Sequence, residues 1–158
     1  MRKRSKYKPK PVMRDALGYV LAGLKPVAAA QEEMTLLGIK NHGAIEAVRT
    51  GNATQAQVEF LVNALNIANA LCCMGQGSDW LPEIEAAQEA IRAACKRPKF
   101  LFTGLELTAV ITAIEVHDAQ MRDPGTTVQL LERAVNGLKK LQAAGKAERL
   151  QFPEGVAA

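Results

Sequence analysis

Two histidines are the first candidates for chemistry in this chain of 158 residues. His117 lies in the run Glu115-Val116-His117-Asp118, where an imidazole beside carboxylates could serve as a general base, a metal ligand or a pH-sensitive contact. His42, in Asn41-His42-Gly43, is interpreted as a residue at a helix start. No His-Glu-x-x-His spacing exists, so a metal site would need distant residues to meet. We keep His42, His117 and Asp118 as a candidate functional polar site, beside the simpler interpretation that His117 is packed with its ring nitrogens satisfied.

The other nucleophilic side chains form no catalytic pattern. The only serines are Ser5 and Ser78, and neither lies in a Gly-x-Ser-x-Gly turn. Cys72 and Cys73 are adjacent and Cys95 lies alone, which matches neither a Cys-x-x-Cys metal spacing nor an even set of disulfides. This usage predicts reduced thiols. We therefore expect no catalytic residue, no metal, no cofactor and no enzymatic activity.

The strongest chemical signal is a basic N-terminal arm. Seven of residues 1–14 are Lys or Arg and none is acidic. Such a run gains nothing from burial and favours a polyanionic partner, above all nucleic acid. The tyrosine among the lysines could stack on an exposed base. The alternative is that the arm docks on the acidic face of its own body or of a second subunit. The predicted nucleic-acid-binding residues are Arg2, Lys3, Arg4, Lys6, Tyr7, Lys8, Lys10 and Arg14.

The rest of the chain is mildly acidic. Thirteen of the 20 basic residues and all 16 acidic residues follow the arm, so residues 15–158 carry a net charge of −3. From residue 50 to residue 91 there are five acids and no Lys or Arg, which argues against a DNA-reading helix-turn-helix over 44–74 because phosphates would be repelled. We expect this acidic stretch and a row of asparagines to contact a protein or a second copy of the chain. The alternative for the asparagines is an uncharged polar face exposed to water. The predicted partner-interface residues are Asn63, Asn66, Asn69, Glu83, Glu85 and Glu89.

Apolar spacing and capping residues predict an all-α bundle of about five to seven helices with an extended basic arm. Thr54 with Gln57 and Thr103 with Glu106 are capping boxes, and Gly38 is expected to end the second helix. Aromatic residues make up only 4% of the chain, so the core must be aliphatic. The predicted helices cover 16–25, 27–37, 41–49, 54–74, 78–97, 103–122 and 127–145.

The predicted organisation is a basic arm over 1–14, a helical domain over 15–145 and a C-terminal tail over 146–158. The uncharged run 60–78 has the length of a membrane span, but its three asparagines and its Gly-Gln-Gly end favour a buried helix. The start of the chain lacks the apolar stretch of a secretory signal. We expect a cytoplasmic protein without a membrane partner.

Three motifs carry a resemblance. Residues 2–11 (RKRSKYKPKP), 39–42 (IKNH) and 115–120 (EVHDAQ) resemble a group of short proteins encoded by phages and prophages of proteobacteria, and the likeness covers most of residues 1–140. The resemblance implies a bacterial cytoplasm during phage growth and implies no activity. We expect a phage accessory protein whose arm contacts nucleic acid or another polyanion and whose body mediates protein or self association. The alternative is an inhibitor of a host defence protein that acts through the acidic helical surface.

Overall fold

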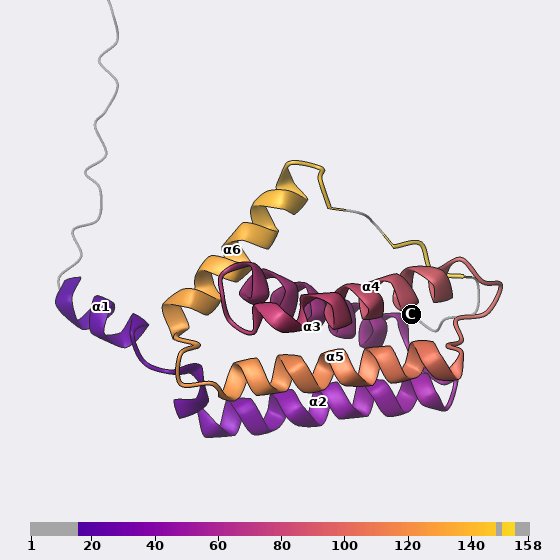
Figure 1. Cartoon of the computed structure of the whole chain (residues 1–158), viewed down its shortest axis with the longest axis horizontal. Coiled ribbons are helices and arrows are strands. Elements are labelled where there is room, and N and C mark those ends of the chain that lie inside the picture. The colour runs from indigo at the N-terminus through magenta and orange to yellow at the C-terminus, as the bar shows by residue number, and fades with distance from the viewer. Residues whose placement is uncertain (1–15, 148–149, 154–158) are drawn as a thin grey trace, which may run out of the picture.

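The helices of this chain pack around one central helix, α3 (Figure 1). The structure is a computed structural model that describes residues 16–147 and 150–153. Its described residues form only helices, turns and loops, with a single isolated β-bridge between Pro26 and Thr127. The elements are α1 (Ala16–Gly23), the 3-10 turn η1 (Val27–Ala29), α2 (Gln31–Arg49), α3 (Gln55–Cys73), the 3-10 turn η2 (Ser78–Trp80), α4 (Leu81–Cys95), α5 (Gly104–Arg122) and α6 (Val128–Ala143).

The bundle has two layers. Helices α2 and α5 run antiparallel in one layer; α3 packs on both of them, and α4 packs on α3 and α5 (Figure 1). Helix α3 contacts α2, α4, α5 and α6, whereas α1 lies at one end of the molecule and contacts α6. The predicted all-α bundle is therefore confirmed.

Aliphatic side chains and alanines build the core. The stripe predicted for α3, which includes Leu61 and Leu65, is buried, and so is the stripe of α4 with Ile84 and Ile91. Helix α3 is also the one described helix whose length and apolar character would suit a membrane span. Its apolar face lies in the core instead, against the other helices.

Side-chain caps start helices α3 and α5 as predicted. Thr54 Oγ1 accepts from the backbone N–H of Gln57 at 3.3 Å, and Gln57 Oε1 accepts from the backbone N–H of Thr54 at 2.9 Å. Thr103 and Glu106 repeat the arrangement at the start of α5. Each box satisfies two amide hydrogens that the first turn of a helix leaves without intrahelical partners.

The prediction that Gly38 ends a helix is wrong. Helix α2 continues through Gly38 and Gly43 to Arg49, and His42 lies inside this helix rather than at its start. A glycine inside a helix costs about 1 kcal/mol relative to alanine, but this local cost is offset when the helix buries a face. The buried face of α2 consists of Asn41, Ala44, Ile45 and Val48.

Three other boundaries differ from prediction. Helix α1 ends at Gly23, and Val27–Ala29 is a 3-10 turn rather than the beginning of a helix. Ser78 and Asp79 do not cap α4, because they belong to η2, and Trp80 is the N-cap without a side-chain hydrogen bond. The proline in the first turn of α4 needs no amide partner there, so the helix starts at Leu81 without a polar cap.

The C-terminal part of the body is only partly packed. Helix α6 has an apolar stripe, but Ala134 is its one buried residue and Leu141 is 48% exposed. In the segment expected to form a tail, Leu150 and Phe152 pack on the core, and the ring of Phe152 lies 6.3 Å from that of Phe100. This segment therefore contributes to the body.

Glu106 should make folding stability depend on acid pH. Its carboxylate accepts from Arg97 through both oxygens, and this hydrogen bonding lowers the pKa of Glu106 to about 2. A depressed folded pKa stabilises the fold above the unfolded value of about 4.5, and the gain is lost as the pH falls towards 2. Because Gln also completes a capping box, Glu106→Gln keeps the cap but removes the charge and one of the two oxygens that accept from Arg97.

We expect urea unfolding to show Glu106→Gln less stable than the unmodified chain at pH 7 and equal to it near pH 2. The matched control is Glu132→Gln, at an exposed position of α6, which should change stability at neither pH. An equal loss for Glu106→Gln at both pH values would contradict the assignment of the low pKa to the Arg97 pair.

Candidate functional site

A polar cluster joins the middle of α2 to the C-terminal half of α5. Asn41 Nδ2 donates to Asp118 Oδ1 at 2.7 Å and lies 3.4 Å from His117 Nδ1. His117 Nδ1 lies 3.3 Å from Asp118 Oδ1, and His42 Nε2 lies 3.6 Å from Asp118 Oδ2. The structure thus brings together His42, His117 and Asp118, the three residues of the predicted polar site, around one carboxylate.

The members of this cluster differ in their exposure to solvent. Asn41 and His117 are 0% and 1% exposed, whereas the His42 side chain is 64% exposed. Asp118 therefore bridges a buried imidazole and one that faces solvent. The Asn41 Oδ1 atom is buried without a hydrogen-bond partner in the described part of the chain, which is unfavourable for a polar atom.

The pKa of Asp118 is lowered. Burial acts in the opposite direction and raises it, but hydrogen bonds from His117 and Asn41, together with the charges of the two histidines, outweigh burial. The carboxylate is therefore held in its charged form, as an acceptor for the groups around it.

The arrangement suits a cross-helix link better than a metal centre. Among residues 16–147 and 150–153, no group of three or more His, Cys, Asp or Glu side chains is placed to hold a metal ion. Asp118 instead accepts a charge-assisted hydrogen bond from a helix 77 positions earlier in the chain. Sequence reasoning missed Asn41 as the donor. The available signal was a polar residue on the apolar face that continues with Ala44, Ile45 and Val48.

Two of the three asparagines in the predicted row make hydrogen bonds within the chain. Asn66 accepts from Gln88 of α4 at 3.0 Å, and Asn69 accepts from Cys73 Sγ at 3.7 Å within α3. Asn63 is the exposed member of the row. A subunit interface through this row stays a prediction, and Asn66 and Asn69 are half-buried.

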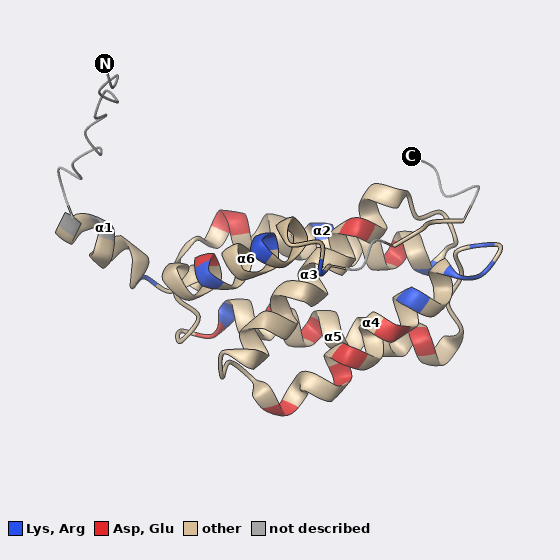
Figure 2. Cartoon of the chain, turned by 90° about the horizontal axis from the view of Figure 1, so that it is seen from above, with Lys and Arg blue, Asp and Glu red and all other residues tan. Residues whose placement is uncertain are grey.

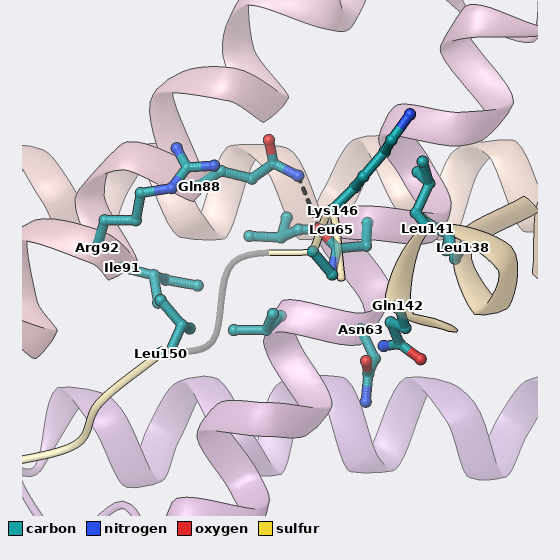
Figure 3. Close-up of a pocket in the computed structure, with 13 residues that line it drawn as sticks. Asn63, Leu65, Gln88, Ile91, Arg92, Leu138, Leu141, Gln142, Lys146 and Leu150 are labelled. Atoms are coloured by element: carbon teal, nitrogen blue, oxygen red, sulfur yellow. Dashed lines mark hydrogen bonds between the residues drawn. The ribbon is translucent and has the colours of Figure 1, made fainter. Parts of the chain in front are cut away.

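Asn63 and Asn66 also line a cavity of about 200 Å³ between α3, α4 and α6 (Figure 3). Its apolar wall includes Leu65, Ile91 and Leu138, and Figure 3 shows these side chains converging from the three helices. The cavity exists because the C-terminal half of α6 diverges from the body (Figure 1). It is small for a ligand site, since such pockets usually enclose about 300–1,000 Å³.

The predicted acidic surface follows α4 (Figure 2). Glu85 and Glu89 are exposed, and Glu89 pairs with Arg92 of the same helix at 3.2 Å. Glu83 is half-buried, and its Oε2 atom has no hydrogen-bond partner among the described residues. Two of the three predicted acidic contacts are thus displayed to solvent.

The predicted basic arm, residues 1–14, lies outside the described residues. No structural statement bears on its eight predicted nucleic-acid-binding residues. What the structure describes is the body to which the arm is joined.

A second cavity lies between η2 and the C-terminal half of α5, with a volume of about 370 Å³. Trp80, Glu115, Gln120 and Asp123 are among its lining residues, and Trp80 is 50% exposed. Sequence reasoning missed this cavity, because Trp80 and α5 are far apart in the chain.

Gln120 is held in the wall of this cavity by three acceptors. Its Nε2 donates to the Gln76 carbonyl oxygen at 2.8 Å, and it lies 3.2 Å from both the Ala68 carbonyl oxygen and Cys72 Sγ. Gln120 Oε1 is buried without a partner in the described part of the chain, which costs about 1–3 kcal/mol. Burial raises the pKa of the Cys72 thiol, so this sulfur is a packed neutral group.

Comparison with known proteins finds no family model, no curated protein and no solved structure that matches this chain.

Removing the side-chain amide of Asn41 should weaken the contact between α2 and α5. Asn41→Ala deletes a buried hydrogen bond to a charged acceptor, so we expect the free energy of unfolding to fall by about 2 kcal/mol. Chemical denaturation followed by circular dichroism measures the loss. Asn136→Ala is the matched control at an exposed position of α6 and should change stability by less than about 0.5 kcal/mol. Equal stabilities for the two variants would contradict the role given to the cluster.

Proposed function

We propose that this chain is a non-catalytic phage-type accessory protein whose basic arm binds nucleic acid and whose helical body binds protein. The separation of charge along the chain carries the proposal. Seven cations and no acid lie in residues 1–14, whereas residues 15–158 have a net charge of −3. A compact acidic body repels phosphates, so the arm is the element that would attract them.

Several charged groups of the described body pair with one another. Three exposed or half-exposed arginines pair with carboxylates inside the body, namely Arg49 with Glu46, Arg92 with Glu89 and Arg97 with Glu106. The core is built from residues of α2 to α6 together with the segment around Phe100 and Phe152.

Salt dependence of binding tests the arm. If the arm neutralises about six phosphates of a duplex, log affinity should fall with log salt with a slope of about −5. Replacing Lys6, Lys8 and Lys10 by Gln should reduce that slope by about 2.7, and deleting residues 2–10 should abolish most of the affinity. Titration of duplex DNA and of single-stranded RNA at several salt concentrations measures both quantities.

The matched control removes three charges from the body instead. Lys96, Lys139 and Lys140 are exposed, and replacing them by Gln should leave the slope unchanged. An equal change of slope for the arm variant and the body variant, or binding that survives the deletion, would contradict the proposal.

The acidic surface of α4 favours a second function, inhibition of a host protein. Asp79, Glu85 and Glu89 are exposed along a stretch without any Lys or Arg from residue 50 to residue 91. Such a surface complements a basic protein face and could mimic the charge of nucleic acid.

The two functions differ in which variant loses the partner. An inhibitor should keep its host protein after deletion of residues 2–10 and lose it when Asp79, Glu85 and Glu89 become Asn, Gln and Gln. If the chain instead binds nucleic acid through its arm, deletion of residues 2–10 should abolish the recovery of the partner and the three acidic substitutions should not. Affinity purification from infected cells, with and without nuclease, measures both, and nuclease-sensitive recovery that needs the arm would contradict inhibition.

A further inference from the structure

The cavity between η2 and α5 presents an unusual set of chemical groups. Its volume of about 370 Å³ lies in the range of small-ligand sites. None of the nine residues that line it is Lys, Arg or His, whereas Glu115 and Asp123 place two carboxylates in its wall. This lining disfavours an anionic ligand and favours a positively charged one.

Trp80 adds an aromatic surface to these carboxylates. The indole lies at the end of η2, is 50% exposed and forms part of the lining. A tryptophan face attracts cations, because the negative face of its π-system meets the positive charge. A half-exposed indole beside two carboxylates is thus a suitable partner for a flat guanidinium or an alkylammonium group.

Gln120 provides a third and independent observation. It is only 6% exposed, and its Nε2 is engaged by the α3–η2 segment. Its carbonyl oxygen remains buried without a partner among the described residues, and Gln120 is one of the residues that line the cavity. A ligand that carries N–H donors suits a wall with an unpaired acceptor, whereas an acceptor-only ligand does not.

Gly77 allows Trp80 and Gln120 to come together. Its backbone has φ +69, in the left-handed region, and a β-carbon there would lie 3.6 Å from Trp80 Cδ1 and 3.7 Å from Gln120 Nε2. The turn at Gly77 therefore places the indole beside the buried amide.

We propose that this cavity binds a guanidinium or alkylammonium group, which stacks on Trp80 and is attracted by the negative charges of Glu115 and Asp123. The site goes beyond the proposed contact between arm and nucleic acid. The cationic group has two sources that share one chemistry, a side chain of the chain's own arm or a cation supplied from outside.

Trp80 is the only tryptophan of the chain, so its fluorescence reports on this site alone. The probes are ethylguanidinium and its uncharged isostere ethylurea, titrated at constant ionic strength into the intact chain and into the chain lacking residues 2–10. We expect ethylguanidinium to change the Trp80 emission saturably at millimolar concentrations, and ethylurea to have no such effect. A calorimetric titration of Trp80→Leu should show that the binding is lost.

Charge variants test the two carboxylates. Glu115→Gln combined with Asp123→Asn should weaken ethylguanidinium binding by about tenfold, and Asn retains the oxygen that accepts from the Gly125 amide. The matched control, Glu32→Gln with Glu132→Gln, removes two exposed charges elsewhere and should leave the affinity unchanged. Circular dichroism verifies that all variants fold.

Comparing the intact chain with the chain that lacks residues 2–10 distinguishes the two sources of the cation. Weaker apparent affinity in the intact chain than in the shortened chain, together with the same emission change on adding a peptide of residues 1–12, assigns the site to the arm. Equal affinities with no effect of the peptide assign it to an outside cation. A linear or absent response in both chains, an equal response to ethylurea, or full affinity in the double charge variant would overturn the proposal.

Discussion

Close approach of helices through small side chains is the constraint on which this structure depends. Aromatic residues make up only 4% of the chain, so few large rings are available to fill space between helices. Alanines that are 0% exposed lie on α3, α4 and α5, at Ala68, Ala87, Ala94 and Ala113. Small residues let backbones approach, so that leucine and isoleucine side chains beside them can fill the remaining volume. Every element that carries a candidate site is positioned by this packing, because α3 contacts α2, α4, α5 and α6.

The polar cluster adds a specific contact to this packing. Helix α2 buries few large apolar groups, and its Leu36 and Ile39 are 57% and 64% exposed. Apolar contact alone would therefore fix its position along α5 weakly. The hydrogen bond from Asn41 to Asp118 requires one amide to meet one carboxylate, and it sets the register of the two helices. The same contact brings His42 and His117 to one carboxylate, although 75 positions separate them in the chain.

Local signals explain what the sequence could predict. The capping boxes at Thr54 and Thr103 and the apolar stripes of α3 and α4 depend on residues three or four positions apart, and the structure contains all of them. The continuity of α2 through Gly38 could not be predicted, because the burial that offsets the glycine comes from other helices. The partner of Asn41 and the cavity beside Trp80 arise from residues that only the fold brings together. The candidate residues of the polar site were predictable by type, whereas their meeting point was not.

The one-sided attachment of α6 has a dynamic consequence. Ala134 is its single buried residue, and its C-terminal half leaves the body above a cavity (Figure 1). A helix held by so little buried surface opens locally at a lower free energy than the core requires for global unfolding. Its amide hydrogens should therefore exchange with solvent long before those of α3, and a protease should cleave α6 while the remaining helices stay folded. Helices α2 to α5 then form a resistant centre, and α6 is a labile helix on its side.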